Sequence, residues 1–514
     1  MGKVINTRES QVSGQQEKLG SFIKSLRERR GLTQSGFAKR LKTSQSAVAR
    51  MEAGRQNFTA QELSRIGKAL EHKIFALDET IDFRITGGRK LHGSITTNYS
   101  KNGAMGLMCA ALLNKSKTIL HGIPRIEEVS RMIEVFTSIG VSVSWIGEQS
   151  LEIKPSKKFD LTKINLSSAQ KVRSIIMLIG PLIHQVKSFS IPHAGGCKMG
   201  NRTIEAHRHG LKALGAKIVT KSDRYEITSG KKRPAEIVMY EASDTATENI
   251  IMASALVPGK TLIEFAPPNY QVQEVCFFLE SLGVKIDGIG TTTLVVHGIS
   301  EIDKEIEYTN SEDPIESMLF ISSAITTGSK LTIKRCPIDF LKLELLKLNK
   351  MGLRYDQSKE YFSKNGRTKL VDIIIYPSTL KEPSDKIHSL PYPGINSDNL
   401  PLFVPIATQA KGTTLIHDWM WENRAIYFTE LNKLGAQVVL ADQHRVFVQG
   451  PTKLKGAQVV CPPALRPAVI ILIAMLAADG VSTLRNVYSI SRGYEGIAER
   501  LNKIGAKIEV MKGA

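Results

Sequence analysis

The residues best suited to chemistry lie in a short glycine-rich loop, Gly195 to Arg202, with Cys197 near its centre. Lys198 and Arg202 follow this cysteine within five residues, and nearby positive charge lowers the pKa of a thiol from about 8.5 toward neutrality. Apolar residues after Arg202 recur at helical spacing, so the first N–H groups of a helix would face an anion there. The loop is therefore a candidate active-site loop for a phosphorylated substrate. The alternative is that Cys197 is a small buried hydrophobic residue.

Length and composition predict a multidomain protein with anionic partners. At 514 residues and about 150 residues per domain, the chain should form two to four domains. Its formal net charge of +20 favours nucleic acid or phosphorylated substrates, the alternative being a generally basic surface. The longest apolar run, Ala468 to Ala478, is shorter than the roughly 20 residues of a membrane span, and the N-terminus lacks the apolar core of a signal peptide. We therefore expect a soluble cytoplasmic protein without a membrane partner.

The five cysteines are scattered along the chain. They show neither paired spacing nor a metal-ligand pattern, which favours a reducing compartment and predicts no metal site.

A run of short amphipathic helices is predicted between residues 19 and 75. Thr33 and Thr59 stand at N-cap positions, and a tight turn at Lys42-Thr43-Ser44 separates the middle pair of helices. With L-T-Q opening the first of this pair and S-Q-S-A-V-A-R-M-E-A-G forming the second, the segment resembles the helix-turn-helix of the phage-repressor family. The resemblance implies a DNA-binding domain over residues 1–79 that acts as a homodimer; the alternative is a helical interaction domain without DNA binding. The residues that would face DNA are Gln34, Gln45, Ser46 and Arg50.

The rest of the chain contains a repeated helix-glycine-strand unit. Six times an amphipathic helix runs into a glycine and then into a strand, at intervals of 75, 68, 69, 83 and 70 residues. Each glycine is predicted to end its helix in the left-handed conformation. A period near 70 residues indicates six copies of one α/β unit rather than a solenoid. The six glycines are Gly140, Gly215, Gly283, Gly352, Gly435 and Gly505.

Six such units with a G-G-C loop are typical of one enzyme family. Residues 81 to 514 resemble UDP-N-acetylglucosamine enolpyruvyl transferase, and the resemblance implies two inside-out α/β domains of three repeats each. Residues 80–100 plus 312–514 would form one domain and residues 101–311 the other, which carries the Cys197 loop. The implied reaction transfers the enolpyruvyl group of phosphoenolpyruvate to the sugar 3-hydroxyl of UDP-N-acetylglucosamine, releases phosphate and serves peptidoglycan synthesis, without a cofactor.

The resemblance also implies roles for individual residues. Cys197 would protonate the methylene carbon and be alkylated by fosfomycin, and Asp398 would face the sugar hydroxyl. Four cations and one amide would bind phosphoenolpyruvate or phosphate: Lys101, Asn102, Arg202, Arg466 and Arg492. A second set would bind the nucleotide sugar: Arg173, Thr203, Ile204, Glu205, Ala206, Ser243, Asp244, Met420 and Arg424. His207 lies where the family keeps a histidine.

Three segments depart from the family pattern. Pro463-Ala464-Leu465-Arg466 replaces T-D-L-R and loses an aspartate, Ser243-Asp244-Thr245 replaces S-V-G and adds a charge near the expected diphosphate, and Asn269-Tyr270-Gln271 replaces E-P-E. These changes keep two alternatives open. The acceptor could be another uridine nucleotide or nucleoside, or the protein could be a DNA-binding regulator whose transferase body senses a cell-wall precursor. The sister family of the shikimate pathway is less favoured, because the G-G-C loop belongs to the nucleotide-sugar branch.

Overall fold

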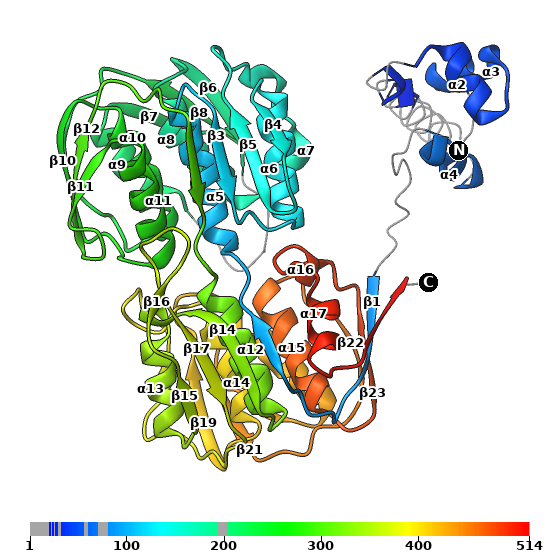
Figure 1. Cartoon of the computed structure of the whole chain (residues 1–514), viewed down its shortest axis with the longest axis vertical. Helices are drawn as coiled ribbons and strands as arrows, with labels where there is room; N and C mark the ends of the chain where they lie inside the picture. Colours follow the sequence, from blue (N-terminus) through cyan, green and yellow to red (C-terminus); the bar gives the residue numbers. More distant parts are fainter. Residues whose placement is uncertain are drawn as a thin grey trace, which may run out of the picture. The chain divides into compact units, whose positions relative to one another are not determined.

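The computed structural model describes residues 20–21, 23–24, 26–28, 32–55, 60–69, 81–193 and 203–512. The chain divides into two compact units, a small N-terminal one ending at Glu79 and a larger one from Thr80 to Gly513 (Figure 1). Among the described residues, no helix is long and apolar enough to cross a membrane.

The small unit is helical, as its sequence predicts. The described residues between 20 and 28 are helical, and they are followed by α2 (Gln34–Leu41), α3 (Gln45–Glu52) and α4 (Ala60–Ala69). Thr33 caps α2 by accepting a hydrogen bond from Gly36 N at 3.0 Å, and Ser44 caps α3 in the same way. Lys42 lies between the two helices in the left-handed conformation, with φ of 53°. The helices share a small core of Ile23, Leu26, Phe37, Ala38, Leu41, Val48, Met51 and Ile66.

The larger unit contains six sheets in its described residues, which matches the six predicted repeats. All six predicted glycines have positive φ, between 85° and 106°, so each ends its helix as expected. Two hydrophobic cores divide the unit into lobe A, which contains the first strand and most residues after 311, and lobe B, which contains most residues from 104 to 308 (Figure 1). We keep 80–100 plus 312–514 and 101–311 as proposed domain limits.

Lobe A joins the two ends of the unit. Strand β1 (Ile81–Thr86) pairs antiparallel with β23 (Val481–Arg485) on one side and with β24 (Ile508–Lys512) on the other. The other strands of this lobe are β2 (Ser94–Thr96), β14 (Leu331–Pro337), β15 (Tyr355–Gln357), β16 (Tyr361–Phe362), β17 (Lys369–Ile375), β18 (Ile387–His388), β19 (Gly412–His417), β20 (Gln437–Leu440), β21 (Arg445–Gly450) and β22 (Gln458–Val460).

The longest helices of lobe A lie inside it. All residues of α12 (Pro314–Thr326) are buried, and α15 (Leu465–Ala477) is buried from Arg466 to Leu476. Helices that are apolar all round belong in a protein interior, so the sheets form the outside of the lobe. The remaining helices are η4 (Ile338–Phe340), α13 (Lys342–Lys350), η5 (Leu400–Leu402), α14 (Phe403–Ala407), η6 (Ala425–Leu434), α16 (Tyr488–Ser491) and α17 (Ile497–Lys503).

Lobe B repeats this plan around the buried helices α5 (Lys101–Ala110) and α10 (Asp244–Ala255). Its strands are β3 (Thr118–His121), β4 (Ser142–Trp145), β5 (Ser150–Lys154), β6 (Ser188–Pro192), β7 (Ala216–Thr220), β8 (Arg224–Ser229), β9 (Glu236–Val238), β10 (Gly259–Glu264), β11 (Lys285–Asp287), β12 (Thr293–Gly298) and β13 (Ile306–Thr309). Its other helices are η1 (Ala111–Leu113), α6 (Glu127–Ser138), η2 (Leu161–Lys163), α7 (Leu166–Ala169), η3 (Arg173–Leu178), α8 (Ile179–Leu182), α9 (Glu205–Ala213) and α11 (Tyr270–Ser281).

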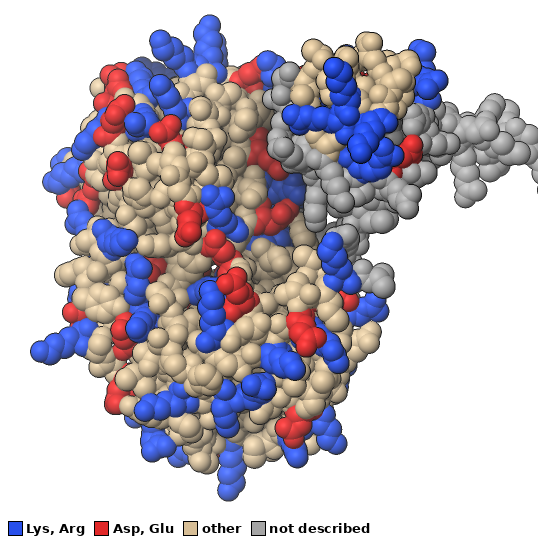
Figure 2. Space-filling model, turned by 45° about the vertical axis from the view of Figure 1, so that its right-hand side comes forward, with Lys and Arg blue, Asp and Glu red and all other residues tan. Residues whose placement is uncertain are grey.

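The chain passes between the lobes through two adjacent segments. Tyr99 forms an antiparallel bridge with Glu312, and Ser100 N donates to Ser311 O at 2.7 Å. On the face of the large unit shown in Figure 2, lysine and arginine side chains are interspersed with aspartate and glutamate. The positive charge on that face is therefore spread out rather than collected in one patch.

Candidate active site

The predicted base, Asp398, lies in a pair with the predicted phosphate ligand Arg466. Asp398 precedes η5 in lobe A, and Arg466 is the second residue of α15. Arg466 Nη2 donates to Asp398 Oδ2 at 2.9 Å, and Arg466 Nη1 donates to the hydroxyl of Tyr494 at 2.5 Å. Burial alone would raise the pKa of Asp398, but Arg466, followed by Arg424 and Lys101, holds it at about 2. Asp398 is therefore ionised, with 27% of its side chain exposed.

Arg424, predicted to bind the nucleotide sugar, lies next to Asp398 in the interior of lobe A. It is completely buried, and its Nε and Nη2 donate to the two oxygens of Asp418 at 2.5 and 2.7 Å. Nη2 also donates to the carbonyl of Ser397 at 2.7 Å, next to Asp398. Its Nη1 has no hydrogen bond within the described residues and lies 4.0 Å from Asp398 Oδ1. In this conformation Arg424 supports the loop of Asp398, while Met420 nearby is half-buried.

Two predicted phosphoenolpyruvate ligands of lobe B, Lys101 and Asn102, begin helix α5. Lys101 Nζ forms an ion pair with Glu128 Oε2 at 2.7 Å, and Asn102 Nδ2 donates to the hydroxyl of Tyr270 at 2.9 Å. Burial opposes the charge of Glu128, but Lys101, Arg492 and Arg466 hold its pKa below the ordinary value. One carboxylate that was not predicted, Glu128, therefore pairs with Lys101 and is stabilised in its charged form by Arg492 and Arg466 of the other lobe.

Cys197 and Arg202 of the glycine-rich loop lie outside the described residues. Their predicted roles stay predictions. The other four cysteines are buried. Burial raises the pKa of Cys336 and Cys461 to about 12, and it also raises the pKa of Cys109 and Cys276. None of these four is therefore a reactive thiol.

On the predicted nucleotide side, His207 links α9 to α10. Its Nδ1 lies 3.1 Å from Asn249 Nδ2 and its Nε2 lies 3.4 Å from Thr245 Oγ1. Since the amide can only donate, Nδ1 accepts and the proton of the imidazole is on Nε2. Burial, and then the charge of Arg173, lowers the pKa of His207 to about 3, so the ring is neutral.

The remaining predicted nucleotide residues differ in accessibility. Arg173 is half-buried at the start of η3, where burial lowers its pKa. Thr203 is exposed, whereas Ile204 and Ala206 are buried in the core of lobe B. Glu205 pairs with Arg208 at 2.7 Å. The side chains of Ile204 and Ala206 therefore pack in the core of lobe B, and their predicted contact with the nucleotide sugar stays a prediction.

The segment that departs from E-P-E lies against two carboxylates of helix α10. Asn269 Nδ2 donates to Asp244 Oδ2 at 2.8 Å, and Gln271 Nε2 donates to Glu248 Oε2 at 3.2 Å. Burial raises the pKa of Asp244 to about 6. The hydrogen bond from Asn269 lowers this pKa, and the negative charge of Asp398 raises it. Burial also raises the pKa of Glu248 well above its ordinary value. Carboxyl groups of α10 thus lie beside Asn269 and Gln271, the two positions at which this chain lacks the glutamates of the E-P-E segment. Ser243 is the N-cap of α10.

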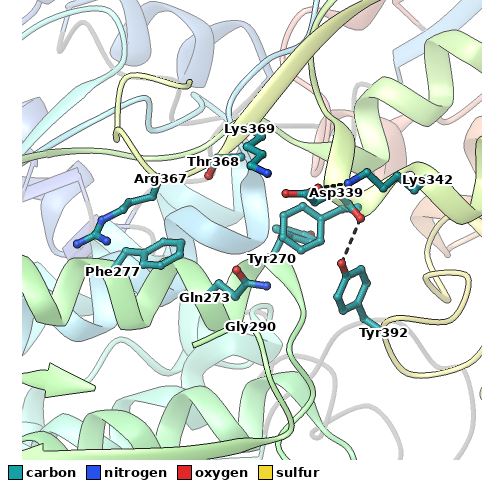
Figure 3. Close-up of a pocket in the computed structure, with 11 residues that line it drawn as sticks. Tyr270, Gln273, Phe277, Gly290, Asp339, Lys342, Arg367, Thr368, Lys369 and Tyr392 are labelled. Carbon is teal, nitrogen blue, oxygen red and sulfur yellow. Dashed lines mark hydrogen bonds and ion pairs between the residues drawn. The ribbon is translucent and has the colours of Figure 1, made fainter. Parts of the chain in front are cut away.

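A separate cavity of about 290 Å³ lies between α11 and the η4, α13 and β17 elements of lobe A (Figure 3). Its three cations already have partners, since Lys342 pairs with Asp339 at 2.5 Å, Arg367 with Glu280 at 3.3 Å, and Lys369 with Glu360 at 3.7 Å. Tyr270 forms part of its wall and also accepts the hydrogen bond from Asn102. None of the predicted site residues lines this cavity.

In the small unit, the predicted DNA-facing residues lie at the start and on the outer side of α2 and α3. Gln45 Nε2 donates to Gln34 Oε1 at 3.4 Å, and Gln34 Nε2 donates to Glu52 at 2.9 Å. Gln45, Ser46 and Arg50 are exposed, whereas Gln34 is half-buried. Glu52, which also pairs with Arg27 at 2.5 Å, was not predicted and holds Gln34 in place.

Comparison with known proteins shows the family of both units. Residues 85–501 match the family model of EPSP synthase (3-phosphoshikimate 1-carboxyvinyltransferase), and residues 18–72 match a helix-turn-helix domain. A UDP-N-acetylglucosamine 1-carboxyvinyltransferase of Borrelia garinii subsp. bavariensis is 35% identical over 428 residues, covering 83% of this chain and 98% of the relative. The enzyme of the same name from Bacteroides thetaiotaomicron is 33% identical over 436 residues, covering 83% of this chain and 99% of the relative.

Solved structures show the same fold. The enolpyruvyl transferase NikO from Streptomyces tendae superimposes with a TM-score of 0.73 at 22% identity, covering 85% of this chain and all of that one. EPSP synthase from Acinetobacter baumannii gives a TM-score of 0.63 at 19% identity, covering 84% of this chain and all of that one. This chain therefore belongs to the EPSP synthase (3-phosphoshikimate 1-carboxyvinyltransferase) family of enolpyruvyl transferases and carries an N-terminal helix-turn-helix domain.

Proposed function

We propose that the larger unit transfers the enolpyruvyl group of phosphoenolpyruvate to the 3-hydroxyl of UDP-N-acetylglucosamine and releases phosphate, in the cytoplasm, for peptidoglycan synthesis. The observation that carries this proposal is the cluster of Asp398, Arg466, Lys101 and Arg492, which unites an ionised carboxylate with cations from both lobes. The names of the relatives at 33–35% identity support the choice of acceptor.

In this reaction Asp398 accepts the proton of the sugar hydroxyl while the hydroxyl oxygen bonds to C2 of phosphoenolpyruvate. The methylene carbon C3 gains a proton, a role assigned to Cys197 by resemblance. Breaking the C2–O bond to phosphate and removing a proton from C3 then restores the double bond in the product. Lys101, Arg466 and Arg492 would stabilise the negative charge of phosphate and carboxylate in both steps.

The ion pair with Arg466 makes Asp398 a weak base, because its pKa is about 2. When Arg466 turns toward the anionic substrate, Asp398 loses part of this stabilisation, and its pKa should rise toward the value that proton transfer requires. Substrate binding would thus activate the base.

The direct test is phosphate release from phosphoenolpyruvate with a panel of acceptors: UDP-N-acetylglucosamine, UDP-glucose, UMP and uridine. We expect turnover with UDP-N-acetylglucosamine. Turnover with UMP or uridine alone would favour the alternative acceptor class, which the negative charge of Asp244 beside the predicted diphosphate position supports. No turnover with any acceptor would favour a regulator that senses a cell-wall precursor.

We further propose that the small unit binds DNA as a homodimer. The exposed side chains of Gln45, Ser46 and Arg50 on α3 support this proposal, because the second helix of a helix-turn-helix enters the major groove. Selection of genomic fragments with the full-length protein tests it, and recovery of no enriched site would leave an interaction domain.

A further inference from the structure

Glu128 stands out as a charged group that the proposed reaction does not use. It is the second residue of α6, is 7% exposed, and lies among cations rather than in solvent. Its partner Lys101 is also largely buried, with 16% of its side chain exposed. Carboxylates are rarely buried to this extent unless they are paired, and Glu128 is paired with Lys101.

Glu128 contacts a cation of its own lobe and is influenced by the charges of two cations of the other lobe. Its Oε2 is 2.7 Å from Lys101 Nζ at the start of α5, within lobe B. Arg492 and Arg466 of lobe A also favour its charged form. The neighbouring residue Glu127 accepts a hydrogen bond from Tyr488 at 3.4 Å, which brings the start of α6 against α16, the helix that precedes Arg492 (Figure 1). Glu128 therefore lies where the cations of the two lobes meet.

Three cations of the candidate site have carboxylate partners. Arg466 has Asp398, Arg424 has Asp418 and Lys101 has Glu128. A phosphate that binds to Lys101 and Arg492 must compete with Glu128 for Lys101 and must tolerate a carboxylate nearby. Like charges in a partly buried site repel strongly, because solvent screens them little.

We propose that Glu128 is a positioning residue that holds the side chain of Lys101 at the start of α5 and, as an internal counter-anion, weakens the binding of phosphate and phosphoenolpyruvate. The inference rests on the proposed function for the identity of the anions. Glu128 would thus have two opposing effects on substrate binding and turnover. It orients Lys101 for the substrate, and it promotes the release of phosphate after each turnover.

Glu128→Gln tests both effects, because it keeps the size of the side chain and removes the charge. The full-length variant should bind orthophosphate more tightly than the wild type in calorimetric titration, by on the order of tenfold or more. The Michaelis constant for phosphoenolpyruvate should fall, and kcat should fall with it, since phosphate leaves more slowly and Lys101 is less well held. A purely structural role would lower kcat without tightening phosphate binding.

Two matched variants make the result specific. Glu127→Gln changes the adjacent carboxylate, which pairs with Arg131 at 2.7 Å, and should leave phosphate affinity within about twofold. Glu128→Asp keeps the charge and should stay within about threefold of the wild type. If Glu128→Asp tightened phosphate binding as much as Glu128→Gln, the charge would not be the cause and the proposal would be wrong.

The double variant Lys101→Gln with Glu128→Gln tests the pair if the single variant folds poorly, because it leaves no unpaired charge. Removing one cation and one anion together should return phosphate affinity close to that of the wild type. Affinity for orthophosphate needs neither acceptor nor turnover. Tighter binding by Glu128→Gln without any transferase activity would therefore support this inference and reject the proposed function, whereas unchanged binding with normal wild-type turnover would overturn the inference alone.

Discussion

Asn269 donates a 2.8 Å hydrogen bond to Asp244, so a carboxyl group lies beside the position where the sequence suggested that one was lost. The pKa of Asp244 is raised to about 6, chiefly by burial. A raised acid pKa destabilises the folded state once the group ionises. Asp244 therefore contributes fully to the free energy of unfolding at pH values below its pKa in the unfolded chain, which is near 4. This contribution is lost as the pH rises through about 6, its pKa in the folded protein.

Asp244→Asn should consequently stabilise the protein at pH 8 by about 1–3 kcal/mol and have little effect at pH 4. Thermal unfolding of variant and wild type at both pH values measures this difference. Equal shifts at the two pH values would show that ionisation of Asp244 is not the cause.

Asp398→Asn should reduce kcat by roughly 10²–10⁴-fold and leave acceptor affinity within about tenfold, because the amide cannot take the proton of the hydroxyl. Steady-state phosphate release and acceptor titration give the two values. Asp385→Asn is the control, since Asp385 is exposed and accepts a hydrogen bond from the backbone N–H of its neighbour Lys386. Turnover at the wild-type rate would remove Asp398 from the mechanism.

Cys197 should be the one thiol that fosfomycin modifies quickly, and bound acceptor should increase the rate. The four other cysteines are buried with raised pKa values and should stay unmodified in the folded protein. Mass spectrometry of peptides after short exposure decides between these outcomes. Equal labelling at all five positions would contradict the assignment of the loop.

Asp418→Asn should destabilise the larger unit by about 3–5 kcal/mol, because it leaves the fully buried guanidinium of Arg424 without its ion-pair partner. Denaturant unfolding measures the change. Asp442→Asn is the comparison, since Asp442 pairs with Arg445 at the surface and should cost less than about 1 kcal/mol. Similar losses in both variants would mean that burial of the pair does not matter.

Arg50→Ala combined with Gln45→Ala should weaken binding to a selected DNA site by several kcal/mol at most, at about 1–3 kcal/mol per base contact. Transfer activity should not change. Fluorescence anisotropy at several salt concentrations measures the affinity, and Arg84→Ala in β1 controls for the loss of one exposed positive charge. Unaltered DNA retention by the double variant would exclude α3 as the reading helix.

The sequence alone determined the features that depend on near neighbours along the chain. The six glycines, the helices before them and the Thr33 cap follow from local backbone preferences and apolar spacing, and the structure confirms them. Family resemblance likewise identified Asp398, Arg466 and Lys101 by motif, and the structure brings their charges within reach of one another.

Only the tertiary structure decided which distant groups meet. Lys101 and Glu128 are 27 residues apart, and Asp244 and Asn269 are 25 apart, so no periodicity or motif spacing links them. The pairing of β1 with β23 and β24, and the burial of Arg424 against Asp418, depend on how the chain packs within lobe A. Since burial and neighbouring charge set a pKa, the ionised Asp398 and the raised pKa of Asp244 could be assigned only once those contacts were known.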